Sequence, residues 1–486
     1  MKIKNILFGL GLTGGLLLSA CQSVIEVEPE FARDGSQIFT NLDDYEFALT
    51  GAYAGFRGVG YFGNGAQTTA SWGVLPDMMS DNLVQTPEDL ANWQDQVNWV
   101  YTTDESDIAV AWQSAYYIVT QANLVLRNID QFATTDATRL RANRLKGQAL
   151  AIRGMVHFDL LRYWGESFDR NSPALGVPYK TVVDAEDMPA RLSVKDTYDN
   201  IFRDLQEAET LLGDVDRAIN SNTNRGRIDQ LGVRAILARA NLYAKNYVAA
   251  ENYATLVINS RPLATRAQFP GIWTDANVSE VIWAVTFSAG EGSPSFNVHV
   301  GSSNRNRYRP SAALEATFDQ ANDIRFPSYF GSRTSAAGAS RRIVQKYMSR
   351  GTTLDNLVDW KAFRVGEMYL IRAEARAMQG AAGAVGALAD LNALRAARIT
   401  GYMPAVLTGQ ALQDAIALER RKELFAEGHR WFDLKRTTRT VNRTEADLPS
   451  TIRTLLPGAR EWVWPIPQGE IDANPNIASQ QSPGYN

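Results

Sequence analysis

The sequence predicts a mostly α-helical protein in which about four degenerate helical hairpins carry long irregular loops and a few short strands. The hairpins are predicted by apolar residues that recur every three or four positions along most of the chain, with short polar turns between successive stretches. The loops are predicted by glycine-rich segments, containing tryptophan and asparagine, that interrupt the helical pattern. A run of branched apolar residues at 281–285 predicts one of the strands.

Helical periodicity is clear in five segments outside the hairpins described next. Asn41 and Ser193 stand just before two of them, at positions where helix N-caps are expected. The segments are 43–56, 108–129, 145–164, 195–212 and 410–427. Tryptophans within apolar stripes are expected in the core, namely Trp112, Trp164, Trp283 and Trp431.

Two pairs of helices have the pattern of a helical hairpin. In the first pair, apolar stripes at 231–242 and 247–257 flank a tight turn at Lys245–Asn246. Small residues at the crossing points and an aromatic residue just after the turn resemble a tetratricopeptide hairpin. The second pair spans 364–379 and 385–397, where several alanines would allow two helices to approach closely.

The first residues form a targeting segment. Lys2 and Lys4 precede an apolar run at 6–18 that is too short for a comfortable membrane span. Leu18-Ser19-Ala20-Cys21 follows and looks like a lipobox, the bacterial motif that is cleaved before a cysteine, which is then acylated. The alternative is a plain secretory signal with an incidental cysteine, but the only cysteine of the chain stands where a lipobox requires it.

We therefore expect a lipid anchor on Cys21. Each buried methylene group contributes roughly 0.8 kcal/mol, and stable attachment to a membrane takes more than one acyl chain. The predicted divisions are a signal peptide at 1–20, a polar lipidated tether at 21–35 and the folded domain at 36–486.

Composition excludes several classes of protein. The 486-residue chain has a formal net charge of -4 and a sequence pI of 5.7, with no basic stripe, so nucleic-acid binding is not expected. A single cysteine excludes an intramolecular disulfide and a cysteine-based metal cage. His157 and His429 have no neighbouring ligands and are expected to be packed or hydrogen-bonded. We expect neither a metal nor a cofactor.

No enzyme signature is found in the sequence. Two Gly-x-Gly-x-x-Gly patterns occur, but the one at 9–14 lies in the targeting segment and the one at 58–63 follows a helix. Dinucleotide binding requires a preceding strand, so both are interpreted as chance. The chain is therefore predicted not to be an enzyme.

Three carboxylates, Glu419, Glu423 and Glu427, fall on one helical stripe and raise the question of a metal or acid–base site. Basic residues surround them, and Arg372 and Arg376 are expected to face them from a neighbouring helix. A salt-bridge network is the favoured interpretation.

Several motifs, most of them in the C-terminal half, resemble the SusD/RagB family of outer-membrane nutrient-binding lipoproteins. The strongest is Glu419-Arg420-Arg421-Lys422-Glu423-Leu424-Phe425-Ala426-Glu427-Gly428-His429-Arg430-Trp431-Phe432-Asp433-Leu434-Lys435-Arg436. Further similar stretches are 112–123, 149–165, 310–325, 360–375, 388–398 and 464–475. The similarity extends from the lipobox to the last residues.

This resemblance implies four tetratricopeptide-like hairpins and a lipoprotein on the outer face of the outer membrane. It implies a partner, a SusC-like TonB-dependent transporter, over whose mouth the lipoprotein sits as a lid. Members capture glycans, or in some cases peptides, for import. The shared motifs are mainly structural, and none transfers a ligand-binding residue to this chain. A helical-repeat scaffold that binds only proteins and a surface glycan hydrolase stay open as alternatives.

The irregular loops at 58–103 and 289–309 contain the residue types that grip sugars. Aromatic rings cover the apolar faces of sugar rings, while amide and charged groups bind the hydroxyls. The candidate ligand-binding residues are Trp72, Asn82, Trp93, Phe296, Asn304, Arg307 and Tyr308. Packing against the core is the alternative for each, and for Trp72 and Trp93 it has equal weight. Arg305, Arg307 and Arg309 would also suit an anionic ligand, although a solvated loop is the default.

Overall fold

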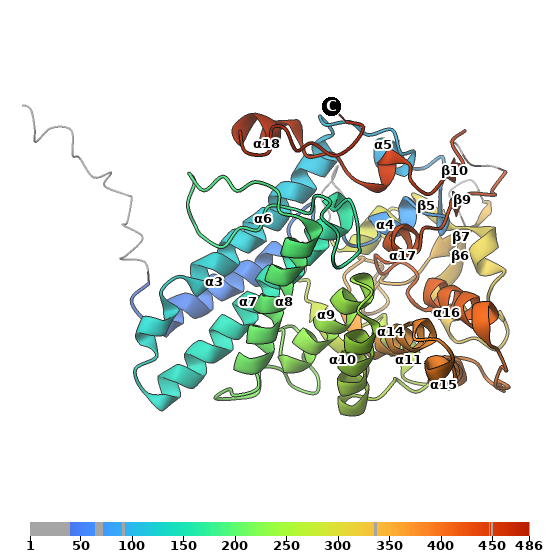
Figure 1. Ribbon diagram of the computed structural model, residues 1–486. Coiled ribbons are helices and arrows are strands. Elements are labelled where there is room, and N and C mark those ends of the chain that lie inside the picture. Colours follow the sequence, from blue (N-terminus) through green and yellow to red (C-terminus); the bar gives the residue numbers. More distant parts are fainter. Residues whose placement is uncertain are drawn as a thin grey trace, which may run out of the picture.

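The computed structural model describes residues 39–63, 71–89, 93–334, 338–446, 448 and 451–485 (Figure 1). The predicted signal peptide, the lipidation site Cys21 and the tether lie outside the described residues. Among the described residues, no helix combines the length and the apolar character needed to span a membrane.

Long helices form the scaffold and confirm the predicted mostly helical fold. In Figure 1 they run across the molecule from α3 and α6 to α15 and α16. Packing follows this order: α3 on α6, α6 on α7, α7 on α8, α9 on α10, α10 on α14, and α14 on both α15 and α16. The bounds are α3 Leu42–Gly55, α6 Ser106–Leu126, α7 Asp136–Trp164, α8 Val194–Leu211, α9 Gln230–Tyr243, α10 Tyr247–Ser260, α14 Val365–Met378, α15 Ala381–Arg398, α16 Gly409–Glu423 and α17 Arg430–Arg436.

The ends of these helices follow local chemistry. Asn41 caps α3 with a capping box, and Ser193 caps α8, as the sequence predicts. Helix α7 begins at Asp136 rather than at the expected residue 145, because Thr135 caps it and its first turns are polar and carry no apolar stripe. Helix α16 stops at Glu423, short of the expected 427, because Ala426 adopts a left-handed conformation with φ of 55°.

Short elements fill the irregular stretches. The helices are α4 Leu75–Met78, α5 Gln94–Val97, η1 Ile129–Phe132, α11 Phe269–Ile272, η2 Pro294–Asn297, α12 Ala312–Glu315, α13 Arg325–Tyr329, η3 Arg460–Trp462 and α18 Gln468–Ala473. Antiparallel strand pairs are β1 Leu83–Gln85 with β5 Tyr308–Pro310, β2 Val281–Val285 with β8 Trp360–Arg364, β3 His299–Val300 with β4 Arg305–Asn306, β6 Phe330–Thr334 with β7 Ser340–Val344, and β9 Val441–Asn442 with β10 Thr454–Leu455. The predicted strand at 281–285 is confirmed as β2.

The pairing of β1 with β5 joins the two loops that the sequence singles out. Leu83 lies opposite Pro310, and Gln85 lies opposite Tyr308. The pairing continues one residue further, where the amide of Thr86 donates to the carbonyl of Arg307 at 2.9 Å. Segments more than 200 residues apart in the chain therefore lie side by side.

Aromatic side chains dominate the core beneath these loops. The predicted core tryptophans Trp112, Trp164, Trp283 and Trp431 are all buried. Trp464 stacks on Tyr163 with ring centroids 3.7 Å apart, and the Trp164 indole donates to the carbonyl of Pro465 at 2.8 Å. The C-terminal segment is thereby fixed against the end of α7.

A buried network of ion pairs links α16 to the loop-bearing segments. Glu423 binds Arg364 at 2.5 Å, Arg398 at 2.9 Å and Arg325 at 2.9 Å. All four side chains are at most 1% exposed. Glu419 binds the same Arg325 at 2.6 Å. The predicted salt-bridge network is confirmed.

Two of its predicted partners are wrong. Arg372 binds Asp390 at 2.7 Å, and Arg376 binds both Asp390 and Glu251. Both arginines project from α14 toward α15 and α10, whereas the network is reached from β8 and the end of α15. Helical periodicity showed that α14 carried basic residues, but not which neighbouring helix each of them faced.

Candidate ligand-binding site

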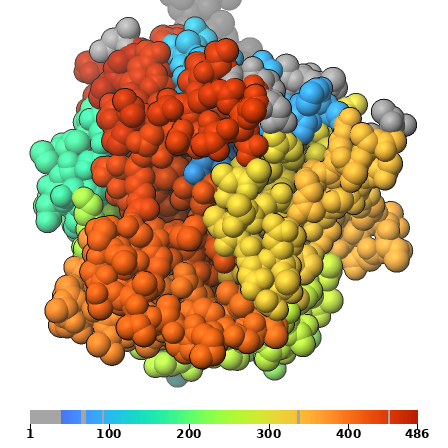
Figure 2. Space-filling model, turned by 90° about the vertical axis from the view of Figure 1, so that its right-hand side faces the viewer, coloured from blue at the N-terminus to red at the C-terminus, as the bar shows by residue number. Residues whose placement is uncertain are grey.

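Three of the seven candidate residues, Trp93, Phe296 and Arg307, come together. The guanidinium carbon of Arg307 lies 5.6 Å from the ring centre of Trp93 and 5.4 Å from that of Phe296. Asn304 lies on the adjoining hairpin of β3 and β4. We call this region the loop surface: Trp93, η2, and the chain from His299 to Arg307. The segments around residues 300–350, yellow to amber in Figure 2, cover one side of the face shown there, beside the red C-terminal segment.

Trp93 has an unusual backbone for a large aromatic residue. Its φ of 53° lies in the left-handed region, where a non-glycine residue stores about 1–3 kcal/mol of strain. The residue directly precedes α5 and is 4% exposed. Its indole nitrogen has no hydrogen-bond partner among the described residues. Backbone strain and unsatisfied buried donors both occur more often at ligand-binding and active sites than elsewhere in a protein.

The β3–β4 hairpin is held rigidly against its neighbours. Asn304 occupies its turn with φ of 51° and donates to the carbonyl of Thr334 at 2.8 Å. The side-chain amide of Asn306 donates to the carbonyl of Arg342 at 2.9 Å, and its backbone N–H donates to the carboxylate of Glu88 at 2.8 Å. The hairpin therefore presents its polar groups in a fixed arrangement.

Several buried polar atoms on the loop surface lack a hydrogen-bond partner within the described part of the chain. They are both side-chain amide atoms of Asn297, Nε2 of His299, Oδ1 of Asn304, and Nε and Nη1 of Arg307. Buried polar atoms in folded proteins are nearly always bonded, to protein, water or ligand. A surface with donors and acceptors left over beside aromatic rings is suited to a hydroxylated ligand.

The other three candidate residues lie in the interior. Trp72 is 1% exposed, stacks on Tyr61 with ring centroids 4.4 Å apart and donates to the carbonyl of Asp159. The Asn82 amide donates to Asp77 at 2.7 Å, and its oxygen accepts from Arg421 at 2.8 Å. Tyr308 is fully buried in β5. This packing matches the alternative reading of these residues, and we leave them out of the proposed site.

Sequence reasoning missed Asn297 and His299. Neither lies in a recognisable pattern, and each gains its place only because η2 and β3 pack beside Arg307. The one available signal was their position inside the loop 289–309, which was already singled out for its aromatic and amide content.

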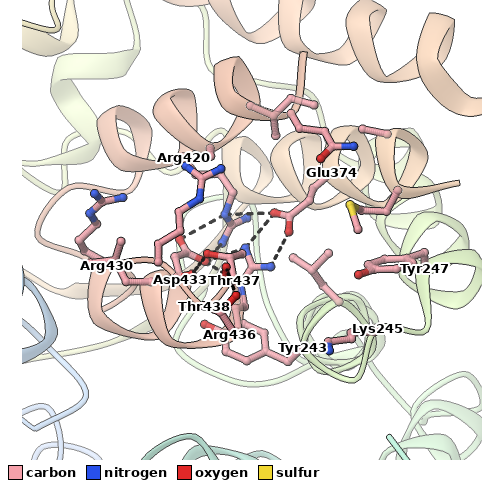
Figure 3. Close-up of a pocket in the computed structure, with 18 of the residues that line it drawn as sticks. Tyr243, Lys245, Tyr247, Glu374, Arg420, Arg430, Asp433, Arg436, Thr437 and Thr438 are labelled. Carbon is pink, nitrogen blue, oxygen red and sulfur yellow. Dashed lines mark hydrogen bonds and ion pairs between the residues drawn. The ribbon is translucent and has the colours of Figure 1, made fainter. Parts of the chain in front are cut away.

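A cavity of about 500 Å³ lies elsewhere, on the scaffold between the α9–α10 turn, α14, α16 and α17 (Figure 3). Its two carboxylates are bound by guanidinium groups: Glu374 by Arg436 at 2.8 Å, and Asp433 by Arg420 at 3.0 Å and Arg436 at 2.8 Å. Burial raises the pKa of Asp433, but these two arginines lower it below its usual range. Glycoside hydrolysis needs a carboxylic acid with a raised pKa, so Asp433 does not fit that role.

The histidines are packed rather than arranged as metal ligands. Nδ1 of His157 bonds the carbonyl of Arg153 at 2.9 Å, and Nε2 accepts from the amide of Lys180 at 3.1 Å. Its ring stacks on Tyr179 with centroids 3.8 Å apart. His429 is also buried. Within the described ranges, no three histidine, cysteine or acidic side chains are grouped as a metal site would require.

Burial of His157 gives a testable pH dependence. Burial lowers its pKa to about 4, so between about pH 6.5 and 4 the unfolded chain binds a proton that the folded chain does not. We expect this residue to cost the folded state about 1.4 kcal/mol per pH unit as the pH falls through that window. Urea denaturation of the wild type and of His157→Gln at pH 7, 6 and 5 measures the difference. Equal pH dependence of the two proteins would contradict the assignment.

The fold and its loop surface define a class of protein: a scaffold of helical hairpins whose inserted loops form a recognition surface. Comparison with known proteins gives the family. A model of the SusD family matches residues 331–485, and a model described as starch-binding associating with outer membrane matches 64–243. The chain belongs to the SusD/RagB family.

The similarity to known relatives extends over nearly the whole chain. A SusD-like protein of Formosa agariphila is 24% identical, with 90% of this chain and 93% of the relative covered. The crystal structure of a SusD superfamily protein from Bacteroides vulgatus is similar with a TM-score of 0.80 at 25% identity, covering 92% of this chain and 100% of that one. Surface glycan-binding protein A from Bacteroides fluxus has a TM-score of 0.74 at 19% identity, covering 91% and 99%.

These similarities confirm the fold class, with its tetratricopeptide-like hairpins, and the family predicted from the sequence. Family membership also confirms the prediction that the chain is a binding protein and not an enzyme.

Proposed function

We propose that the protein binds an oligosaccharide on its loop surface and delivers it to a SusC-like TonB-dependent transporter for import across the outer membrane. Carbohydrate binding and association with the outer membrane are supported by the description of the matching family model and by the glycan-binding structural neighbour. The observation that carries the proposal is the cluster of Trp93, Arg307 and Phe296, with unsatisfied polar atoms beside it.

The cluster supplies the two kinds of contact that a sugar needs. The half-buried ring of Phe296 offers an apolar face to a pyranose ring, and the buried ring of Trp93 lies with it against Arg307. Asn304, which is partly exposed, offers an amide group to its hydroxyls, and the unsatisfied amide of Asn297 and imidazole of His299 lie buried in the same loop. Nothing in this set is arranged to attack a bond, so the proposed role is capture without conversion.

Anchoring completes the proposal. A lipid on Cys21 and the polar tether at 21–35 would hold the domain at the outer membrane, facing the exterior, within reach of its transporter. The same role with a peptide ligand, and a scaffold that binds only proteins, are the alternatives that the binding experiment separates.

Substituting Phe296 or Trp93 with alanine is expected to weaken oligosaccharide binding about tenfold or more, because a buried aromatic contact contributes on the order of 1–3 kcal/mol. A glycan and peptide array identifies a binding oligosaccharide, and calorimetry then measures its affinity for each variant. Phe296 is half-buried, so its variant tests the site even if Trp93→Ala destabilises the fold.

Tyr117→Ala is the matched control, since that aromatic ring is 54% exposed on α6, outside the loop surface. Its affinity should equal that of the wild type. Unchanged affinity in both loop variants would show that the site lies elsewhere. Binding of peptides alone would favour the peptide role, and no saturable binding of either would favour the scaffold.

A further inference from the structure

Three arginines at or beside the loop surface have no ion pair with any described carboxylate: Arg305 and Arg307 on the loop surface, and Arg333 on β6. Their neighbours in the same part of the chain are paired. Those pairs are Arg309 with Glu445, Arg341 with Glu88, Arg342 with Glu315, and Arg350 with Asp275 and Asp359. In this region the unpaired charges are therefore confined to the loop surface and β6 beside it. They do not reflect a basic protein, because the chain carries a net charge of -4.

Arg307 is the most informative of the three. It is 6% exposed and lies against two aromatic rings, with Nε and Nη1 lacking hydrogen-bond partners. Guanidinium groups stay protonated in proteins, so the charge persists although burial lowers the pKa. Asp89 supplies an opposite charge through its field, but no ion pair among the described residues joins it to Arg307. A buried cation that is compensated only at a distance is costly, so a direct counter-charge from a ligand would stabilise it.

The other two arginines add charge around the same place. Arg305 stands on β4, and its field acts on Arg307. Arg333 lies on β6, next to Thr334, whose carbonyl accepts a hydrogen bond from Asn304. The positive charge of Arg333 lowers the pKa of His299. Both arginine side chains are partly exposed, so they can reach a bound molecule. Three like charges around one hairpin repel one another, and an anion bound between them would offset this repulsion because each guanidinium group is attracted to it.

We propose that the oligosaccharide bound at the loop surface is anionic, carrying carboxylate or sulfate ester groups. This inference rests on the proposed function and names its ligand class. The planar fork of Arg307 suits an oxyanion, and the adjacent rings of Trp93 and Phe296 suit the sugar ring that carries it. Arg305 and Arg333 would bind further anionic groups along the chain of the saccharide.

The test compares ligands that differ only in charge. Calorimetry on the intact lipid-free domain uses a galacturonic acid oligosaccharide and its carboxyl-reduced form, and a sulfated galactan oligosaccharide and its desulfated form. We expect at least one anionic member to bind tenfold or more tightly than its neutral counterpart, with affinity falling as salt rises. The two pairs show whether carboxylate or sulfate is the recognised group.

Arg305→Gln and Arg333→Gln should each weaken binding of that anionic member several-fold and reduce its salt dependence, while leaving the neutral member unaffected. Lys245→Gln is the control: it removes one exposed positive charge, unpaired among the described residues, from the α9–α10 turn outside the loop surface, and should change neither. Equal affinity for charged and neutral members overturns this inference and leaves the proposed function standing. Absence of binding to any saccharide overturns both.

Discussion

Replacing Glu423 with glutamine is expected to lower the free energy of unfolding by about 3–5 kcal/mol, because it removes a buried carboxylate that three buried guanidinium groups share. Glu423 is fully buried and bonded to Arg325, Arg364 and Arg398, each at most 1% exposed. Burial raises the pKa of Glu423, but these three arginines lower it well below its usual range, so the carboxylate is ionised in the folded protein. The amide keeps the shape of the side chain and removes the charge.

Chemical denaturation monitored by tryptophan fluorescence measures this loss. Asp414→Asn is the matched control, since Asp414 pairs with Arg439 at 3.0 Å but both side chains are about half exposed. Exposed pairs contribute about 0–1 kcal/mol, so the control should be nearly neutral. Similar unfolding free energies for the two variants would mean that the network does not hold the fold.

The network also explains what the sequence motif at 419–436 does. Glu427 binds Arg364 at 2.7 Å and Lys346 at 2.7 Å, extending the network from α16 to β8 and to the segment after β7. Its carboxylates therefore serve packing between segments rather than ligand binding. The stripe of three glutamates was visible in the sequence, and its interpretation as ion pairs was correct. Its actual partners came from Arg325, Arg364 and Arg398, which helical spacing could not place.

The fold was predictable where the signal is local. Apolar spacing and caps located the long helices, because each helix buries a stripe whose period shows in a single segment. The pairing of β1 with β5 was not predictable, because three-residue strands have no period to detect and their partners lie far away in the chain. The two loops were each recognised by composition, but only the structure joins them.

The same limit applies to the site. Trp93 and Trp72 stand in one loop with similar surroundings in sequence, yet one lies beside Arg307 and the other in the aromatic core. The arginines at 305, 307 and 309 form a simple alternation in the sequence. Whether each is paired depends on Glu445, which binds only Arg309 of the three and lies beyond any sequence window. Ion-pair status, which carries the inference of an anionic ligand, is a property of the folded chain.

Gly428→Ala is expected to destabilise the protein by about 2–4 kcal/mol. Gly428 has φ of +77°, where a side chain costs on the order of 1 kcal/mol. A Cβ atom there would also lie 2.3 Å from the carbonyl oxygen of Trp72 and 2.8 Å from that of Gly73. Overpacking against backbone, which cannot rotate away, adds about 1–3 kcal/mol. Differential scanning calorimetry should show a clearly lower Tm.

Two other glycines separate the conformational strain from the clash. Gly458→Ala has a comparable φ of +82° with nothing within 4 Å, so it should cost only about 1 kcal/mol. Gly469→Ala, in helix α18, has open space and an ordinary φ and should be neutral or stabilising by up to about 1 kcal/mol. If Gly428→Ala costs no more than Gly458→Ala, the close approach between the 419–436 motif and the Trp72 backbone is not a tight contact. If it costs more, this motif supports the loop that leads into β1, because the glycine lets that loop's backbone pack directly against it.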